Sequence, residues 1–253
     1  MRSLVQTIDR FDLLSVATGD DECLVVEGAD LAEGEDNLVW KAVRALVGRP
    51  DRPRLSMTLS KSVPVAAGLG GGSSDAAAAL RAAAEVYRKS DEEVRAAAPL
   101  VGADVPYLLD GGTVWMGGRG ELITPQPALA GFCVAVAVPR FGISTADAYR
   151  RWDEMEGPTG PAVEGRQLPP ALRDLGPLRN DLVPAALSLE PELGDWTADL
   201  ARLWARPVMM TGSGSAHFAY FVDFDEATGA AGAVPEAGVA FAARLRSGGV
   251  SAR

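Results

Sequence analysis

A run of glycines in the first half of this chain of 253 residues limits what can form around it. The run, Gly68-Leu-Gly-Gly-Gly-Ser-Ser-Asp75, follows residues 55–59, where apolar and polar residues alternate as in a half-buried strand. The alanine-rich stretch after it predicts a helix that begins near Ala76 and runs through Val86. Because glycine adopts positive φ angles that other residues avoid, the run predicts a tight loop between a strand and a helix.

Backbone N–H groups give this loop its candidate function. Glycines let a ligand approach the backbone closely, and a helix N-terminus adds unpaired N–H donors and a partial positive charge. Together they form a cradle for an anion, most often a phosphate. Ser73 and Ser74 are candidate caps of the helix, and their hydroxyls are candidate ligands of phosphate or magnesium. The alternative is a glycine-rich turn that only begins a helix.

Two familiar nucleotide-binding loops do not fit these residues. No lysine follows the glycines, so the loop is not a Walker A motif. Gly71 and Gly72 break the dinucleotide-binding fingerprint, and no acidic strand end follows at the expected spacing. The loop therefore indicates another class of phosphate-binding protein.

Composition excludes several other classes. The chain has 24 Lys and Arg against 34 Asp and Glu, a formal charge of −10 that disfavours a nucleic-acid partner. The two cysteines, Cys23 and Cys133, form no CxxC pair, and His217 is the only histidine, so thiolate zinc sites and Ser–His–Asp chemistry are not expected. Charged residues interrupt the first twenty positions and the apolar runs are short. These features predict a cytoplasmic protein without a membrane partner.

Hydrophobic spacing predicts a mixture of strands and helices. Strands are expected over residues 4–16, 23–26, 55–59, 111–123 and 132–138, and helices over residues 37–47, 76–86 and 91–101. Further on, the sequence predicts a long loop at 157–170, partly helical structure at 182–196 and a strand–turn–strand unit at 208–222. The mixture indicates an α+β chain with a domain junction near residues 124–130.

Four stretches in a fixed order carry a family resemblance. Lys61-Ser-Val-Pro64-Val-Ala-Ala-Gly68-Leu-Gly-Gly-Gly-Ser-Ser-Asp75 resembles the second motif of the galactokinase–homoserine kinase–mevalonate kinase–phosphomevalonate kinase superfamily. Gly102-Ala-Asp104-Val-Pro-Tyr107, followed by Gly118-Arg-Gly-Glu121, resembles a catalytic-aspartate motif. Gly142-Ile-Ser-Thr145-Ala-Asp-Ala-Tyr149 resembles the segment that enters the C-terminal domain, and Thr211-Gly212-Ser-Gly214-Ser215 resembles the third motif. The resemblance covers nearly the whole chain.

The resemblance implies a fold and a reaction. The fold is the two-domain α+β fold of small-molecule kinases, with a ribosomal-protein-S5-like N-terminal domain (1–126), a ferredoxin-like C-terminal domain (127–253) and an active site between them. Within the superfamily, the motifs are most similar to kinases that use ATP and Mg²⁺ to phosphorylate the 2-hydroxyl of a cytidine diphosphate-linked methylerythritol in non-mevalonate isoprenoid biosynthesis. The implied partner is that small molecule, and the implied state is a monomer or homodimer. Two alternatives remain open, a related kinase with another acceptor and a nucleotide-binding relic.

The resemblance also implies the site residues. Asp104 is the implied general base, although an aspartate in such a loop can instead cap the next turn. The implied nucleotide-binding residues are Asn37, Lys61, Pro64, Ala67, Gly68, Leu69, Gly70, Gly71, Gly72, Ser73 and Ser74, of which Ser74 is also the implied magnesium ligand. The implied acceptor-binding residues are Thr145, Gly212, Ser213 and Gly214.

Several residues have structural interpretations beside these. For Lys61 and Asn37, the alternative to nucleotide binding is a solvated position on the surface. Asn180 and Asp181 are interpreted as loop or helix-start structure, and His217 as a packing residue on a strand.

The start of the sequence departs from the family pattern. Family members begin with a strand that carries lysine and asparagine, followed by an Asp-Gly-Tyr-His signature, and residues 3–9 resemble the segment just after that signature. No residue of this sequence matches the lysine beside the catalytic aspartate or the Tyr-His pair that binds cytidine. We therefore expect no residue here to take those roles, and catalysis to be slower as a result.

Overall fold

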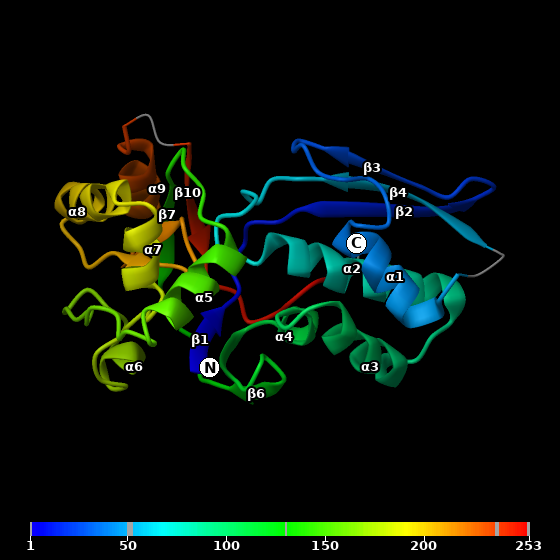
Figure 1. Cartoon of the computed structure of the whole chain (residues 1–253), viewed down its shortest axis with the longest axis horizontal. Helices are drawn as coiled ribbons and strands as arrows, with labels where there is room; N and C mark the ends of the chain where they lie inside the picture. The colour runs from blue at the N-terminus through cyan, green and yellow to red at the C-terminus, as the bar shows by residue number, and fades with distance from the viewer. Residues whose placement is uncertain (1, 50–52, 130, 236–237, 252–253) are drawn as a thin grey trace. The chain divides into compact units, whose positions relative to one another are not determined.

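The computed structural model describes residues 2–49, 53–129, 131–235 and 238–251, which form two compact units of an α+β fold (Figure 1). The first unit consists of Met1–Val65, Gly70–Ala128 and Arg246–Arg253, and the second of Ala66–Leu69 and Leu129–Leu245. The C-terminal segment joins the first unit through hydrogen bonds from the Arg246 N–H to the Thr7 carbonyl and from the Val250 N–H to the Leu108 carbonyl. The sequence-based boundary at residues 126/127 stays a prediction.

Two three-stranded sheets form the strand layers of the first unit. One has the order β1–β5–β6 and is antiparallel: β1 (Arg2–Gln6), β5 (Thr113–Gly117) and β6 (Leu122–Pro125). The other has the order β2–β4–β3: β2 (Leu13–Gly19) is antiparallel and β3 (Cys23–Glu27) parallel to the central β4 (Arg54–Ser60). The expected single extended segment over 4–16 is thus two strands in different sheets, because residues 7–12 turn the chain between them.

Two helices pack against one face of the second of these sheets, and two more pack against those helices (Figure 1). They are α1 (Leu38–Val47), α2 (Gly71–Tyr87), α3 (Asp91–Val101) and α4 (Val105–Asp110). Leu55, Met57 and Leu59 of β4 are buried in one core with α1 and α2, as their alternation predicts. The alanines of α2 let it lie close to its neighbours, since small side chains permit close backbone approach.

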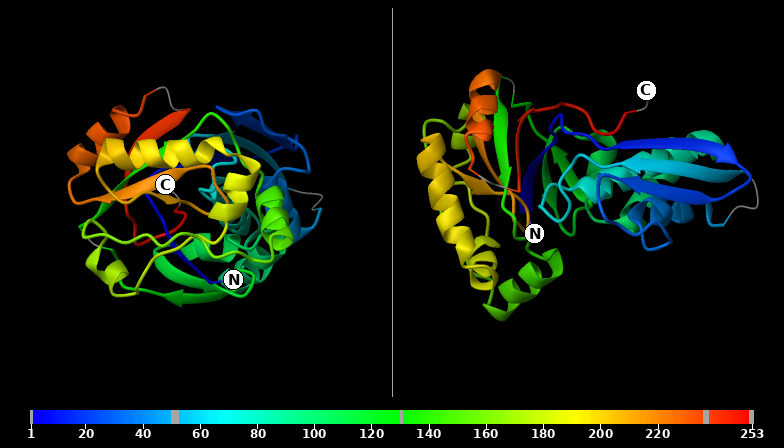
Figure 2. Two further views of the ribbon diagram at one scale, coloured as in Figure 1. Left: turned by 60° about the vertical axis from the view of Figure 1, so that its left-hand side comes forward. Right: turned by 90° about the horizontal axis from the view of Figure 1, so that it is seen from above.

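An antiparallel sheet of order β10–β7–β9–β8 forms the centre of the second unit. Its strands are β7 (Cys133–Val138), β8 (Met209–Met210), β9 (His217–Phe221) and β10 (Val239–Arg244). Around it lie α5 (Thr145–Glu154), α6 (Pro170–Arg173), α7 (Val183–Leu189), α8 (Glu192–Trp204) and α9 (Phe224–Gly232). All six residues of β7 are buried, and its small residues Cys133, Ala135 and Ala137 pack with α8 and α9, which share that face (Figures 1 and 2).

Most of the expected elements are confirmed, including the helices over 37–47 and 91–101 and the strand–turn–strand unit at 208–222. Among the described residues, no helix combines the length and the hydropathy that a membrane crossing requires.

Candidate active site

The glycine loop ends in the N-terminus of α2, which begins earlier than the sequence predicts. Gly70 is the N-cap residue, with φ of +69°, and the helix starts at Gly71 instead of near Ala76. The expectation that Ser73 or Ser74 caps the helix is therefore wrong, because both lie inside its first turn and the cap makes no side-chain hydrogen bond. Within the described part of the chain, the hydroxyls of both serines have no hydrogen-bond partner. Both hydroxyls can therefore form hydrogen bonds with a ligand.

Helix geometry leaves the N–H groups of Gly71, Gly72 and Ser73 without intrahelical acceptors. The N–H of Ser74 donates to the Gly70 carbonyl (3.0 Å) and closes the first turn. Three free N–H groups, two free hydroxyls and the partial positive charge of a 17-residue helix meet at this end of α2. That combination is suited to bind phosphate oxygens.

The first half of the glycine loop contacts the third motif inside the second unit. The Thr211 hydroxyl donates to the Gly68 carbonyl (3.1 Å), and the Ala216 N–H donates to the Ala67 carbonyl (3.1 Å). Gly68 has φ of +73°, and a Cβ at this position would lie 2.4 Å from the Thr211 carbonyl oxygen. Only glycine fits, so two motifs that lie more than 140 residues apart in sequence form one paired loop.

The turn of the third motif is held by two polar side chains. The Thr145 hydroxyl, in the first turn of α5, makes a 2.8 Å hydrogen bond with the Ser213 hydroxyl. Asn180 donates from Nδ2 to the carbonyls of Met210 (2.9 Å) and Gly212 (2.8 Å), and its Oδ1 accepts from the Leu182 N–H (3.0 Å). The predicted acceptor-binding residues 145 and 212–214 are thus brought together.

The bond from the Leu182 N–H confirms the helix-start role that the sequence predicts for Asn180, whereas the contact of Asn180 with the third motif is not predicted from the sequence. Its partners lie 30 and 32 residues further along the chain, so no local spacing reports them. Asp181, beside Asn180, stabilises the loop at residues 157–170, since its carboxylate accepts from the Gly160 N–H (2.9 Å).

Asp104 precedes α4 in the first unit. It is the N-cap residue by position but makes no side-chain cap bond, so the capping alternative does not describe it. Its carboxylate has no hydrogen-bond or ion-pair partner among the described residues, and burial raises its pKa above the ordinary value. Leu108, one turn further along α4, lies beside Gly70, since a Cβ on that glycine would be 3.9 Å from its side chain. The helix that begins at the candidate base therefore packs against the start of α2.

Lys61 does not occupy a solvated surface position. Its ammonium lies 2.5 Å from Asp12 Oδ2 and 2.7 Å from Asp75 Oδ2, and the three side chains are 3%, 2% and 5% exposed. Burial alone would lower the pKa of the Lys61 ammonium, but the hydrogen bonds to the two carboxylates outweigh it and hold that pKa above the ordinary value. Burial also raises the pKa of Asp75, against the opposing effect of Lys61.

Asn37 is the N-cap residue of α1. Its Oδ1 accepts from the Val39 N–H (2.9 Å) and its Nδ2 donates to the Ala32 carbonyl (2.7 Å). The side chain thus has a structural role that accounts for both of its polar atoms. Pro64, between Lys61 and the glycines, is half-buried.

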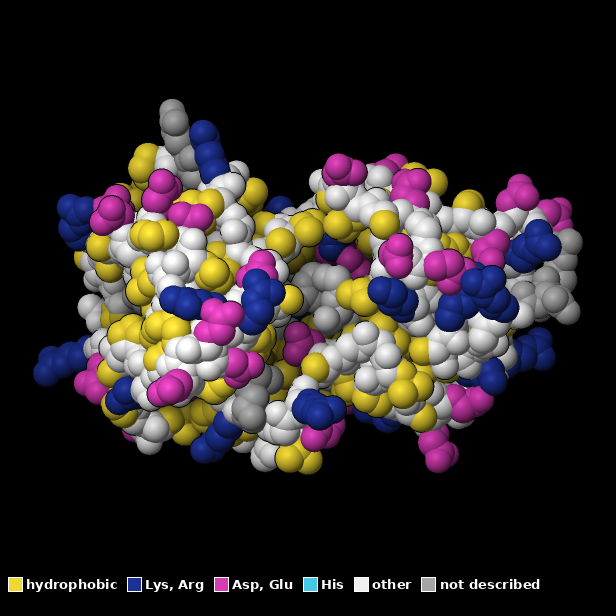
Figure 3. Space-filling view, viewed as in Figure 1, with side chains coloured by type: hydrophobic (Ala, Val, Ile, Leu, Met, Phe, Trp, Pro, Cys, Tyr) yellow, Lys and Arg dark blue, Asp and Glu magenta, His cyan; other side chains and the backbone are white. Residues whose placement is uncertain are grey.

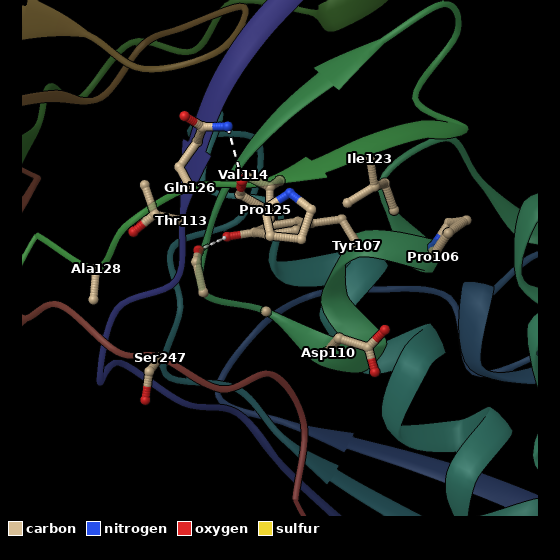
Figure 4. A pocket seen from close by; sticks show the side chains of 12 residues that line it. Pro106, Tyr107, Asp110, Thr113, Val114, Ile123, Pro125, Gln126, Ala128 and Ser247 are labelled. Atoms are coloured by element: carbon tan, nitrogen blue, oxygen red, sulfur yellow. Dashed lines mark hydrogen bonds between the residues drawn. The ribbon is translucent and has the colours of Figure 1, made fainter.

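A small cavity of the first unit lies beside β5 and β6 (Figure 4). It has a volume of about 220 Å³, and its walls include Tyr107, Val114, Ile123, Pro125 and Gln126. The Tyr107 hydroxyl donates to the Gly112 carbonyl (2.8 Å), and the Gln126 amide donates to the Pro125 carbonyl (2.8 Å). None of the motif residues named for the nucleotide or the acceptor lines this cavity.

Charge on the surface is mixed in sign. On the face drawn in Figure 3, carboxylates and basic side chains are interspersed. An anionic ligand therefore has to be bound by local groups such as the N-terminus of α2, as the net charge of −10 already indicated.

Known proteins share this arrangement of fold and motifs. The family described as GHMP kinases N terminal domain matches residues 37–112, which include α1, the glycine loop and Asp104. A 4-diphosphocytidyl-2-C-methyl-D-erythritol kinase from Methylorubrum extorquens (strain PA1) is 39% identical over 251 residues, covering 92% of this chain and 85% of the relative. One from Saccharopolyspora erythraea is 34% identical, covering 98% and 83%.

A solved structure is similar to this chain in both fold and sequence. The crystal structure of a 4-(cytidine 5'-diphospho)-2C-methyl-D-erythritol kinase is similar with a TM-score of 0.76 and 31% identity, covering 98% of this chain and 90% of that one. Fold and motifs together define a small-molecule kinase of the GHMP class. Within that class, the chain belongs to the 4-diphosphocytidyl-2-C-methyl-D-erythritol kinase family.

Proposed function

We propose that this protein transfers the γ-phosphoryl group of ATP to the 2-hydroxyl of 4-diphosphocytidyl-2-C-methyl-D-erythritol, a step of non-mevalonate isoprenoid biosynthesis. The observation that carries the proposal is the open N-terminus of α2, with two unpartnered serine hydroxyls, in the same unit as the unpartnered carboxylate of Asp104. The similarity to named kinases over more than nine-tenths of the chain supports the choice of acceptor.

The nucleotide phosphates are assigned to the glycine loop. The N–H groups of Gly71, Gly72 and Ser73 donate to phosphate oxygens, while glycine at positions 68 and 70 allows the close backbone approach. Phosphoryl transfer depends mainly on positioning and on stabilising charge that spreads over the transferred group, which fixed N–H dipoles do well.

Magnesium enters with ATP, and Ser74 is the protein group proposed to contact it. Mg²⁺ binds oxygen ligands and keeps several waters and phosphate oxygens, so a single hydroxyl beside the phosphates suits it. The described residues contain no group of three or more His, Cys, Asp or Glu side chains that could hold a metal without the nucleotide. When bound, the ion would neutralise part of the negative charge on the ATP phosphates.

Asp104 is proposed as the general base. As the 2-hydroxyl oxygen bonds to the γ-phosphorus, the bond from that phosphorus to the β,γ-bridging oxygen breaks and ADP leaves. The hydroxyl proton passes to the Asp104 carboxylate, whose raised pKa makes it a better proton acceptor than an exposed aspartate. Residues 145 and 212–214 are assigned to the acceptor, since the Thr145 hydroxyl makes a hydrogen bond with Ser213 in the turn that residues 212–214 form in the second unit.

The test is product formation by the purified protein with MgATP and the cytidyl acceptor. We expect ADP and a product heavier by one phosphoryl group, with the new phosphate on the 2-hydroxyl by ³¹P NMR. Homoserine and mevalonate, offered separately, are expected to give no product. Transfer to either alcohol but not to the cytidyl acceptor would retain the kinase assignment and refute the acceptor. Absence of transfer to all three would refute the proposed function.

A further inference from the structure

The buried cluster of Asp12, Lys61 and Asp75 brackets the glycine loop. Lys61 lies three residues before Pro64, and Asp75 is the fifth residue of α2, so the ammonium joins the chain on both sides of the loop. A Cβ on Gly71 would lie 3.4 Å from Lys61 Nζ, which puts the cluster directly against the first residue of the helix.

Asp12 fixes the entry to the loop as well. Its Oδ1 accepts from the N–H groups of Ser62 (2.5 Å) and Val63 (2.8 Å), while its Oδ2 accepts from the Lys61 ammonium. One carboxylate thereby holds three consecutive residues that lead into the glycines. The cluster thus connects the segment before β2, the end of β4 and the first turns of α2.

The side chain of Lys61 has almost no exposed surface to offer a ligand. Its side chain is 3% exposed, and two carboxylates already accept from it. To reach a nucleotide it would have to leave both, and two buried carboxylates would then face each other without a counter-ion, which is strongly unfavourable. Other charged groups nearby already have contacts: Arg10 donates to the Ser62 carbonyl, and Glu27 accepts from the Ser60 hydroxyl.

We propose that Lys61 is a positioning residue, which sets the glycine loop and the N-terminus of α2 through Asp12 and Asp75, and that it does not contact the nucleotide. This role differs from the one that the family resemblance implies for Lys61, and it rests on the proposed function because it concerns the same ATP site. Displacing phosphate-binding N–H groups by a fraction of an ångström is sufficient to weaken a polyanion site markedly.

A double-mutant cycle separates positioning from direct contact, because formal charge can be kept constant. The native cluster carries two carboxylates and one ammonium, a formal charge of −1. Lys61→Met leaves the cluster with a formal charge of −2. Lys61→Met combined with Asp75→Asn restores a formal charge of −1 and lets the new amide donate to Asp12. Asp75→Asn alone keeps an acceptor for Lys61. Lys89→Met, which removes an ammonium from an exposed pair with Glu93, is the matched control.

MgATP affinity is measured by calorimetry on each protein, with folding checked by circular dichroism. We expect Lys61→Met to weaken binding by about tenfold or more, and the double variant to bind within about threefold of the native protein. Asp75→Asn is expected to weaken binding less than Lys61→Met does, and the Lys89 control to bind as the native protein does. If Lys61→Met does not fold, the affinity of the double variant decides alone, because that protein also lacks the ammonium.

Two outcomes overturn the inference, and they differ from each other. A folded double variant that binds MgATP more than about tenfold more weakly than the native protein shows that the ammonium itself contacts the nucleotide. Failure of the native protein to bind MgATP refutes the proposed function, and the inference falls with it.

Discussion

Mild acid is expected to destabilise the second unit through His217. This side chain on β9 is 2% exposed, and its ring nitrogens lie 3.0 Å from the Ser215 carbonyl and 2.9 Å from the Thr197 hydroxyl. Because a carbonyl can only accept, Nδ1 carries the proton of the neutral ring, and Nε2 faces the Thr197 hydroxyl, whose single proton is shared between this nitrogen and the Leu193 carbonyl 2.7 Å away. Burial lowers the pKa of His217 to about 4, although the bond to Ser215 acts in the opposite direction.

The size of the effect follows from that pKa. In the unfolded chain histidine has a pKa of about 6.5, so between pH 6.5 and 4 the unfolded state binds a proton that the folded state does not. Stability is complete above the unfolded pKa and falls as the pH decreases toward 4. At about pH 5 the ring binds a proton in nearly all unfolded molecules, and the loss is about 2 kcal/mol, or roughly thirtyfold in the unfolding equilibrium.

Urea unfolding followed by circular dichroism between about pH 8 and pH 5 measures this loss. His217→Asn is the matched variant, since its amide can donate to the Ser215 carbonyl but does not titrate. The variant is expected to be less stable at every pH, because it leaves a cavity, yet to lack the 2 kcal/mol decline attributed to His217. Subtracting the two curves removes the contributions of carboxylates, which both proteins share. Parallel curves would refute the assignment of a buried neutral histidine.

Three further predictions concern the site. Asp104→Asn is expected to slow phosphoryl transfer by about two to four orders of magnitude with unchanged MgATP affinity, so a full rate in a single-turnover assay would exclude it as the base. Gly70→Val is expected to abolish MgATP binding in calorimetry, whereas Gly48→Val, with a similar φ of +69° in open space, should retain it. Asn180→Ala leaves the carbonyl of Gly212 without a donor and should raise the KM for the acceptor more than the KM for ATP; equal changes would contradict the assignment.

The helix over 91–101 was predicted correctly at both ends, because Ser90 and Glu93 form a capping box and Gly102 ends the helix, all within one local stretch. The start of α2 was predicted five residues late, since two glycines with poor helix propensity form its first positions. That turn is helical because the left-handed Gly70 caps it and because Asp75 is tied to Lys61.

The sequence by itself determined the α+β class, the motifs and the residue types that suit phosphoryl transfer, because each depends on short-range periodicity or on fixed spacing. Only the tertiary structure decided which groups are free to act. Asp104 and Ser74 are unpartnered within the described residues, whereas Lys61 is held by Asp12, 49 positions away in sequence, and by Asp75. Whether a charged side chain binds a ligand or supports a loop depends on contacts between distant segments, and these form only when the chain packs.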